Sequence, residues 1–293
     1  MGTSRDAAAN NSMDKVLKVR DLVVRYHTDE PHAHKAVDGI SFDIASSEVV
    51  GLMGESGCGK SSIALALLGL LPGESTAVSG SVSFRDHELL KMGEQSLQKI
   101  RGAEISLVFQ EPGISLSPVM RAGDQIAEVI HAHRAWTWSR CRDEAETMLA
   151  RVGFDETRRI FSAYPHQLSG GQRQRIVLAQ ALSCSPALLI ADEPTASLDA
   201  RSQAEFVALL RKLKEESQIS ILLISHTPEI QASLADRVLV MKDGRIVEEG
   251  SLAQLYQHPH HPYTRAILRR SRRAIDANID SEAEIPVQEQ FVR

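Results

Sequence analysis

Eight consecutive residues, Gly54 to Ser61, have the types and spacing of a phosphate-binding loop, G-x-x-x-x-G-K-S. The glycines let successive backbone N–H groups point at one anion. At this spacing we expect Lys60 to reach the β- and γ-phosphates of a nucleotide and the Ser61 hydroxyl to bind Mg²⁺. The residues expected to contact the nucleotide here are Gly54, Glu55, Ser56, Gly57, Cys58, Gly59, Lys60, Ser61 and Ser62.

The flanks of this loop are those that the motif requires. The apolar run Val49–Met53 predicts a buried strand before it, and Ser62–Leu68 predicts a helix after it. The positive N-terminal end of such a helix adds to the attraction for phosphate. The alternative is a glycine-rich turn that caps an ordinary helix. It is disfavoured because every motif position and both neighbours agree.

A pair of carboxylates, Asp192 and Glu193, follows the apolar run Leu188–Ala191. In a doubly wound sheet, ligands bind beyond the carboxyl ends of the strands, where the phosphate loop also lies. Asp192 is therefore expected to hold Mg²⁺ directly or through water. Glu193 would face the other way and could polarise a water for attack on the γ-phosphate. The alternative is an acidic pair that merely starts a helix.

The elements that must position these groups alternate along the chain. Apolar strands at 49–53, 104–110, 187–191 and 220–225 alternate with helical stretches, which predicts an α/β fold with a mostly parallel sheet and helices on both faces. Alternating runs at 16–26 and 37–44 predict an antiparallel β layer before it.

Two further stretches interrupt this alternation. The helix-rich block from about 88 to 165 suggests an inserted helical subdomain, with 88–101 taken as one helix. Within it, residues 111–118 hold two prolines and a glycine and predict a loop.

Composition excludes several classes of function. A net charge of −5 and an aromatic content of 4% give no case for binding nucleic acid. Cys58, Cys141 and Cys184 form no C-x-x-C pair, so neither a zinc site nor a disulfide framework is predicted, which fits a reducing cytosol. Prolines between the histidines at 258–261 break helical spacing and disfavour a metal site there.

No membrane span is expected from the sequence. The longest apolar stretch, 63–71, is far shorter than the roughly 20 residues that a bilayer requires. Residues 1–14 are polar and are expected to be disordered, without a signal-peptide core. If the protein works at a membrane, other chains must supply the spans. The predicted organisation is a catalytic domain at 15–265 followed by a tail at 266–293.

One motif points to a family. Leu168–Gln172 reads L-S-G-G-Q, which matches the signature motif of ATP-binding cassette (ABC) transporters. The chain resembles their nucleotide-binding subunit over nearly all of 16–265. That resemblance implies a P-loop NTPase (RecA-like) core, ATP and Mg²⁺ as ligands, and a head-to-tail dimer. In the dimer, the γ-phosphate of ATP on the partner would be clamped by Ser169, Gly170, Gly171 and Gln172.

The resemblance also assigns roles at single positions. Tyr26 corresponds to the aromatic that stacks on adenine, although an ordinary strand tyrosine is the alternative. Gln110 corresponds to the glutamine that touches Mg²⁺ and the attacking water, and Asp199 lies in the loop that crosses the dimer interface. His226 corresponds to the switch histidine at the γ-phosphate. The expected catalytic set is thus Glu193, His226 and Gln110, and the expected metal set is Ser61, Gln110 and Asp192.

Further stretches favour one branch of the family. Phe109–Pro112 and His261–Ala266 resemble importers of oligopeptides, dipeptides and nickel. Many members end in a cysteine-rich segment linked with an iron–sulfur cluster, but no cysteine follows Cys184 here, so no such cluster is expected.

This branch implies an ATP-hydrolysing subunit at the cytoplasmic face of the inner membrane, held there by transmembrane permease subunits. A second ATPase subunit is expected, and a heterodimer is favoured over a homodimer. The ATPase subunit itself would not touch the solute. The alternative is the ATPase subunit of a soluble assembly, such as the carbon–phosphorus lyase system.

Overall fold

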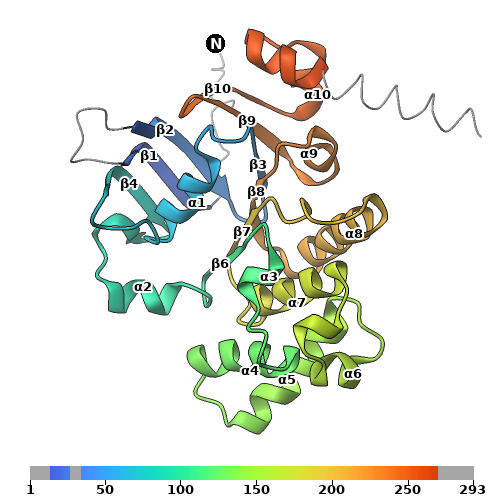
Figure 1. Cartoon of the computed structure of the whole chain (residues 1–293). Coiled ribbons are helices and arrows are strands. Elements are labelled where there is room, and N and C mark those ends of the chain that lie inside the picture. Colours follow the sequence, from blue (N-terminus) through green and yellow to red (C-terminus); the bar gives the residue numbers. More distant parts are fainter. Residues whose placement is uncertain (1–13, 27–33, 270–293) are drawn as a thin grey trace, which may run out of the picture.

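Two β-sheets and a set of helices make up residues 14–26 and 34–269, which are the residues described by this computed structural model (Figure 1). The larger sheet has six strands in the order β10-β9-β3-β8-β7-β6. Its strands are β3 (Val49–Met53), β6 (Ile105–Val108), β7 (Leu188–Asp192), β8 (Ser220–Ile224), β9 (Arg237–Lys242) and β10 (Arg245–Gly250). All neighbouring pairs are parallel except β9 and β10. The predicted mostly parallel sheet is confirmed.

The smaller sheet is antiparallel, with the order β2-β1-β4-β5. Its strands are β1 (Lys15–Tyr26), β2 (His34–Ala45), β4 (Thr76–Phe84) and β5 (His87–Glu88). Their buried alternate residues, such as Leu17, Val19 and Ile44, pack toward the larger sheet. The predicted N-terminal β layer is therefore present.

The helices lie on both faces of the larger sheet and in a separate group. They are α1 (Lys60–Leu67), α2 (Glu94–Ile100), α3 (Pro112–Ser115), α4 (Ala122–His133), α5 (Trp138–Arg151), α6 (Thr157–Ser162), α7 (Gly170–Leu182), α8 (Ala200–Ser217), α9 (Pro228–Leu234) and α10 (Leu252–Gln257). Residues 262–269 are also helical. Figure 1 shows α4, α5 and α6 together at the end of the molecule away from α10.

The central strand β3 shows why the sheet needs cover on two sides. All five of its residues are buried. Val50 and Leu52 pack in the core cluster that includes Ile63 of α1. Val49 packs on the opposite side, in the cluster that includes Ile176 of α7. An apolar run without polar alternation is the pattern of a strand that is buried on both faces.

The predicted helical block at 88–165 differs from the structure at its N-terminal side. Residues 88–101 are not one helix, because a 3-10 turn at Leu89–Lys91 precedes α2. The apolar side of α2 packs with α1 and the smaller sheet through Leu97 and Ile100. The strand β6 then completes the larger sheet. The helices that pack mainly on one another, α4, α5 and α6, begin only after β6.

Other boundaries also differ from the prediction. The expected loop at 111–118 contains the short helix α3, whose proline stands at the first turn, where its missing N–H costs no hydrogen bond. The predicted tail at 266–293 begins inside the helix at 262–269, where Ile267 and Leu268 are buried. The expected disorder at 1–14 falls, apart from its last residue, outside the described residues.

Candidate nucleotide site

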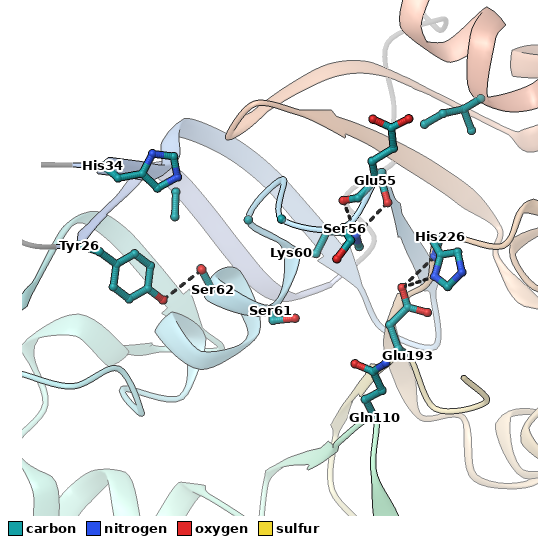
Figure 2. Close-up of a pocket in the computed structure, with 15 residues that line it drawn as sticks. Tyr26, His34, Glu55, Ser56, Lys60, Ser61, Ser62, Gln110, Glu193 and His226 are labelled. Carbon is teal, nitrogen blue, oxygen red and sulfur yellow. Dashed lines mark hydrogen bonds and ion pairs between the residues drawn. The ribbon is translucent and has the colours of Figure 1, made fainter. Parts of the chain in front are cut away.

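A cavity of about 620 Å³ opens between the smaller sheet and the carboxyl edge of the larger one. Figure 2 shows Tyr26 and His34 at one end of it and Glu193 and His226 at the other. Its lining residues are Tyr26, His34, Ala36, Gly54, Glu55, Ser56, Gly57, Gly59, Lys60, Ser61, Ser62, Gln110, Glu193, His226 and Ile267. The structure thus brings together most of the residues that the sequence predicts for the nucleotide.

The phosphate loop needs glycine for two physical reasons. Gly57 and Gly59 adopt φ of 82° and 108°, in the left-handed region that other residues avoid. At Gly54 and Gly59 the neighbours also come too close for a side chain. A Cβ would lie 2.3 Å from the Met241 carbonyl oxygen at Gly54 and 2.1 Å from the Ala36 carbonyl oxygen at Gly59.

Lys60 is the first residue of α1 and its side chain curls back over the loop. The residue is only 7% exposed. Its Nζ donates to the carbonyl oxygens of Gly54, at 2.8 Å, and Glu55, at 3.0 Å. A buried ammonium therefore lies inside the loop, where its hydrogen-bond acceptors are two carbonyl oxygens and, at 3.9 Å, the Cys58 sulfur. An anionic phosphate is a stronger partner for such a charge.

Asp192 ends β7 below the loop and is 8% exposed. Burial raises the pKa of this carboxyl, and the Glu193 charge raises it further, while a hydrogen bond with Ser61 and the Lys60 charge oppose the shift. Its Oδ1 is buried with no hydrogen-bond partner among the described residues. Hard oxygen ligands beside an unpaired carboxylate oxygen suit Mg²⁺. The donor set of Ser61 and Asp192 therefore fits the predicted ion.

Glu193 leaves the strand in a left-handed conformation, with φ of 48°. Such a backbone is strained for a residue with a side chain and is common at functional sites. The turn places its side chain in the same cavity as the phosphate loop. Its Oε1 accepts from the backbone N–H of His226, at 3.0 Å, and lies 2.8 Å from His226 Nδ1. Since the carboxylate accepts, the proton of this imidazole bond belongs on Nδ1.

Several residues at the ends of the cavity complete it. The Tyr26 hydroxyl lies 3.1 Å from the Ser62 hydroxyl, so this tyrosine is tied to α1 (Figure 2). Gln110 follows β6 and lines the cavity beside Glu193. His34, Ala36 and Ile267 were not predicted to line the site. No local pattern marks them, because each reaches the cavity only through long-range packing.

The other predicted residues lie elsewhere. Cys58 does not line the cavity, and burial raises the pKa of its thiol. Ser169, Gly171 and Gln172 line a second cavity of about 380 Å³. Ser169 caps α7 in a reciprocal pair of bonds with Gln172, so the backbone amides of Ser169 and Gln172 are already bonded within the chain.

Asp199 and Gly170 are also apart from the nucleotide cavity. Asp199 caps α8, with its Oδ1 2.9 Å from the Ser202 amide. These bonds from Ser202 lower the pKa of Asp199. Gly170 is the first residue of α7, at a position where the amide has no intrahelical partner. One chain therefore presents a phosphate loop and a separate helix start, each in its own cavity.

A phosphate loop between a buried strand and a helix, with carboxylates at the end of a neighbouring strand, defines a P-loop nucleotide-binding protein. A family model described as ABC transporter matches residues 37–196. The chain belongs to the ABC transporter family, whose cassettes bind and hydrolyse ATP.

Curated relatives match over most of the chain. OppD of Escherichia coli (strain K12), an oligopeptide transport ATP-binding protein, is 40% identical over 95% of this chain and 82% of the relative. DppD of Bacillus subtilis (strain 168), a dipeptide transport ATP-binding protein, is 40% identical over 87% of this chain and 76% of the relative.

A solved structure is similar as well. The ATP-binding cassette MJ0796, described as a dimer in a post-hydrolysis state bound to ADP and Pi, has a TM-score of 0.71 and 28% identity. The match covers 80% of this chain and 98% of that chain. In the described residues, no helix is long and apolar enough to cross a membrane.

Proposed function

We propose that this chain is the ATP-hydrolysing subunit of an importer for oligopeptides or dipeptides. The observation that carries the enzymatic part is the single cavity that holds Lys60, Glu193 and His226 together. The cargo class rests on similarity to OppD and DppD, which favours peptides over nickel. These relatives support a transport role, and we therefore prefer it to a soluble assembly.

In this proposal the phosphate loop binds the triphosphate of ATP. Lys60 exchanges the carbonyl oxygens of Gly54 and Glu55 for the β- and γ-phosphate oxygens. The first backbone amides of α1 have no partner within the helix and can donate to the same phosphates. Tyr26, held by Ser62 at the far end of the cavity, stacks on the adenine.

Ser61, Asp192 and Gln110 would hold Mg²⁺. Bound there, the ion neutralises charge on the phosphates during transfer. The unpartnered Oδ1 of Asp192 is the protein's main contribution, because a cation next to it offsets the cost of burying this carboxylate.

Glu193 is the general base. Both of its bonds to His226 end on Oε1, which leaves Oε2 to accept a proton from the attacking water. His226 fixes the rotamer of Glu193 through Nδ1, and its Nε2 side is available to the γ-phosphate. General-base assistance of this kind is worth roughly 10²–10⁴-fold in rate.

A second subunit completes the site. The helix start at Ser169–Gln172 lies in a cavity apart from the phosphate loop, so one chain cannot apply both to one nucleotide. A head-to-tail dimer solves this geometry by pairing each loop with the partner's Ser169, Gly170 and Gly171, and Asp199 lies near the same interface. The dimeric state of MJ0796 supports this arrangement. We favour a heterodimer of related ATPase chains.

The permease contact is proposed at the loop that follows Gln110. Phe109, Ile114 and Val119 are 42%, 82% and 80% exposed, which is unusual for large apolar side chains next to a nucleotide site. They would receive apolar residues of a transmembrane subunit and place this chain at the cytoplasmic face of the membrane.

This contact loop is held in shape from behind. The Gln125 side chain, 4% exposed, donates to the carbonyl oxygens of Ser117 and Met120, both at 3.0 Å, and accepts from the Ser117 amide at 2.9 Å. These bonds join the contact loop to α4. A movement that starts at Gln110 can therefore move the loop, α4 and the helices packed on α4 together.

The proposal is tested by Glu193→Gln in the assembled dimer. Hydrolysis should fall by roughly 10²–10⁴-fold while ATP still binds, because the amide keeps the shape but cannot accept the proton. Glu216→Gln at the exposed end of α8 is the matched control and should turn over normally. Unchanged hydrolysis in Glu193→Gln would remove Glu193 from this role.

The transport part has a separate test. Affinity purification of the tagged chain in detergent should recover two polytopic membrane proteins. Recovery of a soluble enzyme assembly instead would overturn the transport role and leave the ATPase role intact.

A further inference from the structure

Residues 258–269 lie beside the phosphate loop, although they fall outside the range that the family model matches. The link is Tyr263, whose hydroxyl oxygen accepts a hydrogen bond from the Glu55 backbone N–H at 2.9 Å. The carbonyl oxygen of the same Glu55 accepts from Lys60 Nζ at 3.0 Å. Tyr263 is thus connected to the phosphate-binding Lys60 through one loop residue.

The ring of Tyr263 is itself fixed. Lys242 Nζ lies 5.4 Å from the ring centroid, within the range of a cation–π contact. The His261 ring meets it edge-on, with centroids 6.5 Å apart, and His261 Nδ1 accepts from the Tyr263 amide at 3.2 Å. Partial burial raises the pKa of the hydroxyl, so it stays protonated and neutral at physiological pH. A rigid neutral acceptor therefore faces the loop.

The segment that carries Tyr263 is anchored from two sides. Glu248 of β10 accepts from the amides of His260, at 2.8 Å, and His261, at 3.0 Å. On the other side, Ile267 and Leu268 pack in a core cluster with Met53, the residue directly before the loop. Ile267 also lines the nucleotide cavity.

We propose that residues 258–269 form part of the nucleotide site, and that Tyr263 is a positioning residue that holds the phosphate loop in its phosphate-binding shape. The proposal rests on the ATP site described above. A loop built from small residues has many backbone conformations, and fixing one of them before binding saves entropy when the ligand arrives. By holding the peptide unit at Glu55, Tyr263 fixes the half of the loop that has no helix behind it.

The alternative is that the segment only covers the edge of the sheet and adds stability. The two roles differ in what Tyr263→Phe should change. The variant keeps the ring, its contacts with Lys242 and His261, and the packing of Ile267. It removes only the acceptor of the Glu55 amide.

The experiment compares the full chain with its Tyr263→Phe variant in three measurements. Affinity for the magnesium complex of a non-hydrolysable ATP analogue should weaken about two- to tenfold, the range for one hydrogen bond. Amide hydrogen exchange in peptides that contain Glu55 should become faster without nucleotide. The thermal midpoint without nucleotide should stay unchanged. Glu216→Gln is the control, since Glu216 is exposed near the end of α8 and belongs neither to the segment nor to the nucleotide cavity, and it should alter none of the three.

Unchanged affinity in Tyr263→Phe would overturn the proposal. So would weaker affinity that merely follows a lower thermal midpoint, because that is the result of a structural role. If the wild-type chain bound no magnesium nucleotide, the ATP site itself would fail. The exchange rate at Glu55 would still report on whether Tyr263 holds the loop.

Discussion

Replacing Asp192 by asparagine should make the empty protein more stable and the enzyme inactive. The carboxylate is 8% exposed, and Oδ1 has no partner in the described part of the chain. Burial and the neighbouring Glu193 charge raise its pKa, so the charged form is unfavourable in the folded state. Asparagine has the same shape without the charge, and it removes both penalties.

The sign of the pH dependence follows from the raised pKa. A carboxyl with a raised pKa in the folded state contributes stability below its unfolded pKa of about 3.9 and loses it as pH rises through the folded value. Above the folded pKa this stability is lost, whereas asparagine has no proton to lose and its stability does not change in this way. The advantage of the variant should therefore be largest at neutral pH and shrink on acidification.

Asparagine still leaves a polar group buried at this position, so the gain comes only from removing the charge, which costs more to bury than the about 1–3 kcal/mol of a neutral unsatisfied group. The hydrogen bond with Ser61 already offsets part of this cost. We therefore expect the free energy of unfolding at pH 7 to rise by about 1 kcal/mol, which corresponds to roughly 2–4 °C in the thermal midpoint for a chain of this size. Hydrolysis should fall by at least about 100-fold, because metal assistance is worth several kcal/mol.

The assay is thermal unfolding in a chelator, with pH varied from neutral downward, followed by titration with Mg²⁺ and nucleotide. Asp236→Asn is the contrasting variant, because Asp236 accepts from the Val49 amide at 2.8 Å and pairs with Lys214 at 3.0 Å. It should destabilise the fold. A less stable Asp192→Asn variant at pH 7 without metal would refute the argument from burial.

Three further changes have defined outcomes. Lys60→Ala should weaken nucleotide binding itself, seen as a higher dissociation constant in equilibrium titration, whereas loss of turnover alone would contradict the assigned phosphate contact. Gly51→Ala should lower the free energy of unfolding by about 2 kcal/mol, because a Cβ would lie 2.0 Å from Gln231 Oε1. Urea unfolding of the double variant with Gln231→Ala should recover part of that loss, because the clashing side chain is gone. Ser169→Ala should lower the free energy of unfolding by about 1 kcal/mol, because α7 loses its N-terminal cap, and it should also lower the rate of ATP hydrolysis. An unfolding curve that matches wild type would argue against the capping bond with Gln172.

The sequence could predict the phosphate loop and the carboxylates because the residues that mark each of them are neighbours in the chain. Gly54–Ser61 needs only its own glycines and the strand and helix beside it. Asp192 and Glu193 needed one general rule, that the carboxyl ends of parallel strands share an edge. The prediction that Glu193 faces the other way came from strand alternation. The left-handed turn at this residue, with φ of 48°, ends that alternation and brings its side chain into the cavity.

Features decided by distant packing could not be predicted. The helix α9 and the strand β10 carry no strong period and form where the larger sheet offers them a face and an edge. The strand β9 differs, because its apolar run Val238–Met241 is the same kind of signal as that of β3 and could have been predicted. Tyr263 belongs to a stretch that resembles importers, and only the fold shows that it meets Glu55, 208 positions away in the sequence. The strand expected at 104–110 lies inside the block predicted at 88–165, and only the fold shows that it joins the larger sheet as β6.

The place of β3 in the sheet has a consequence for how the chain is made. Val49 pairs with Ile221 of β8, and Val50 pairs with Arg237 of β9. The strand that leads into the phosphate loop therefore leaves the ribosome early, but its partner β8 follows only 172 residues later (Val49 to Ile221) and its partner β9 only 187 residues later (Val50 to Arg237). Until then an apolar strand with two open edges must be shielded, which makes this segment a natural client for chaperones during translation. A fragment that stops at residue 196, where the family match ends, would keep the loop's sequence without either strand that holds it in place.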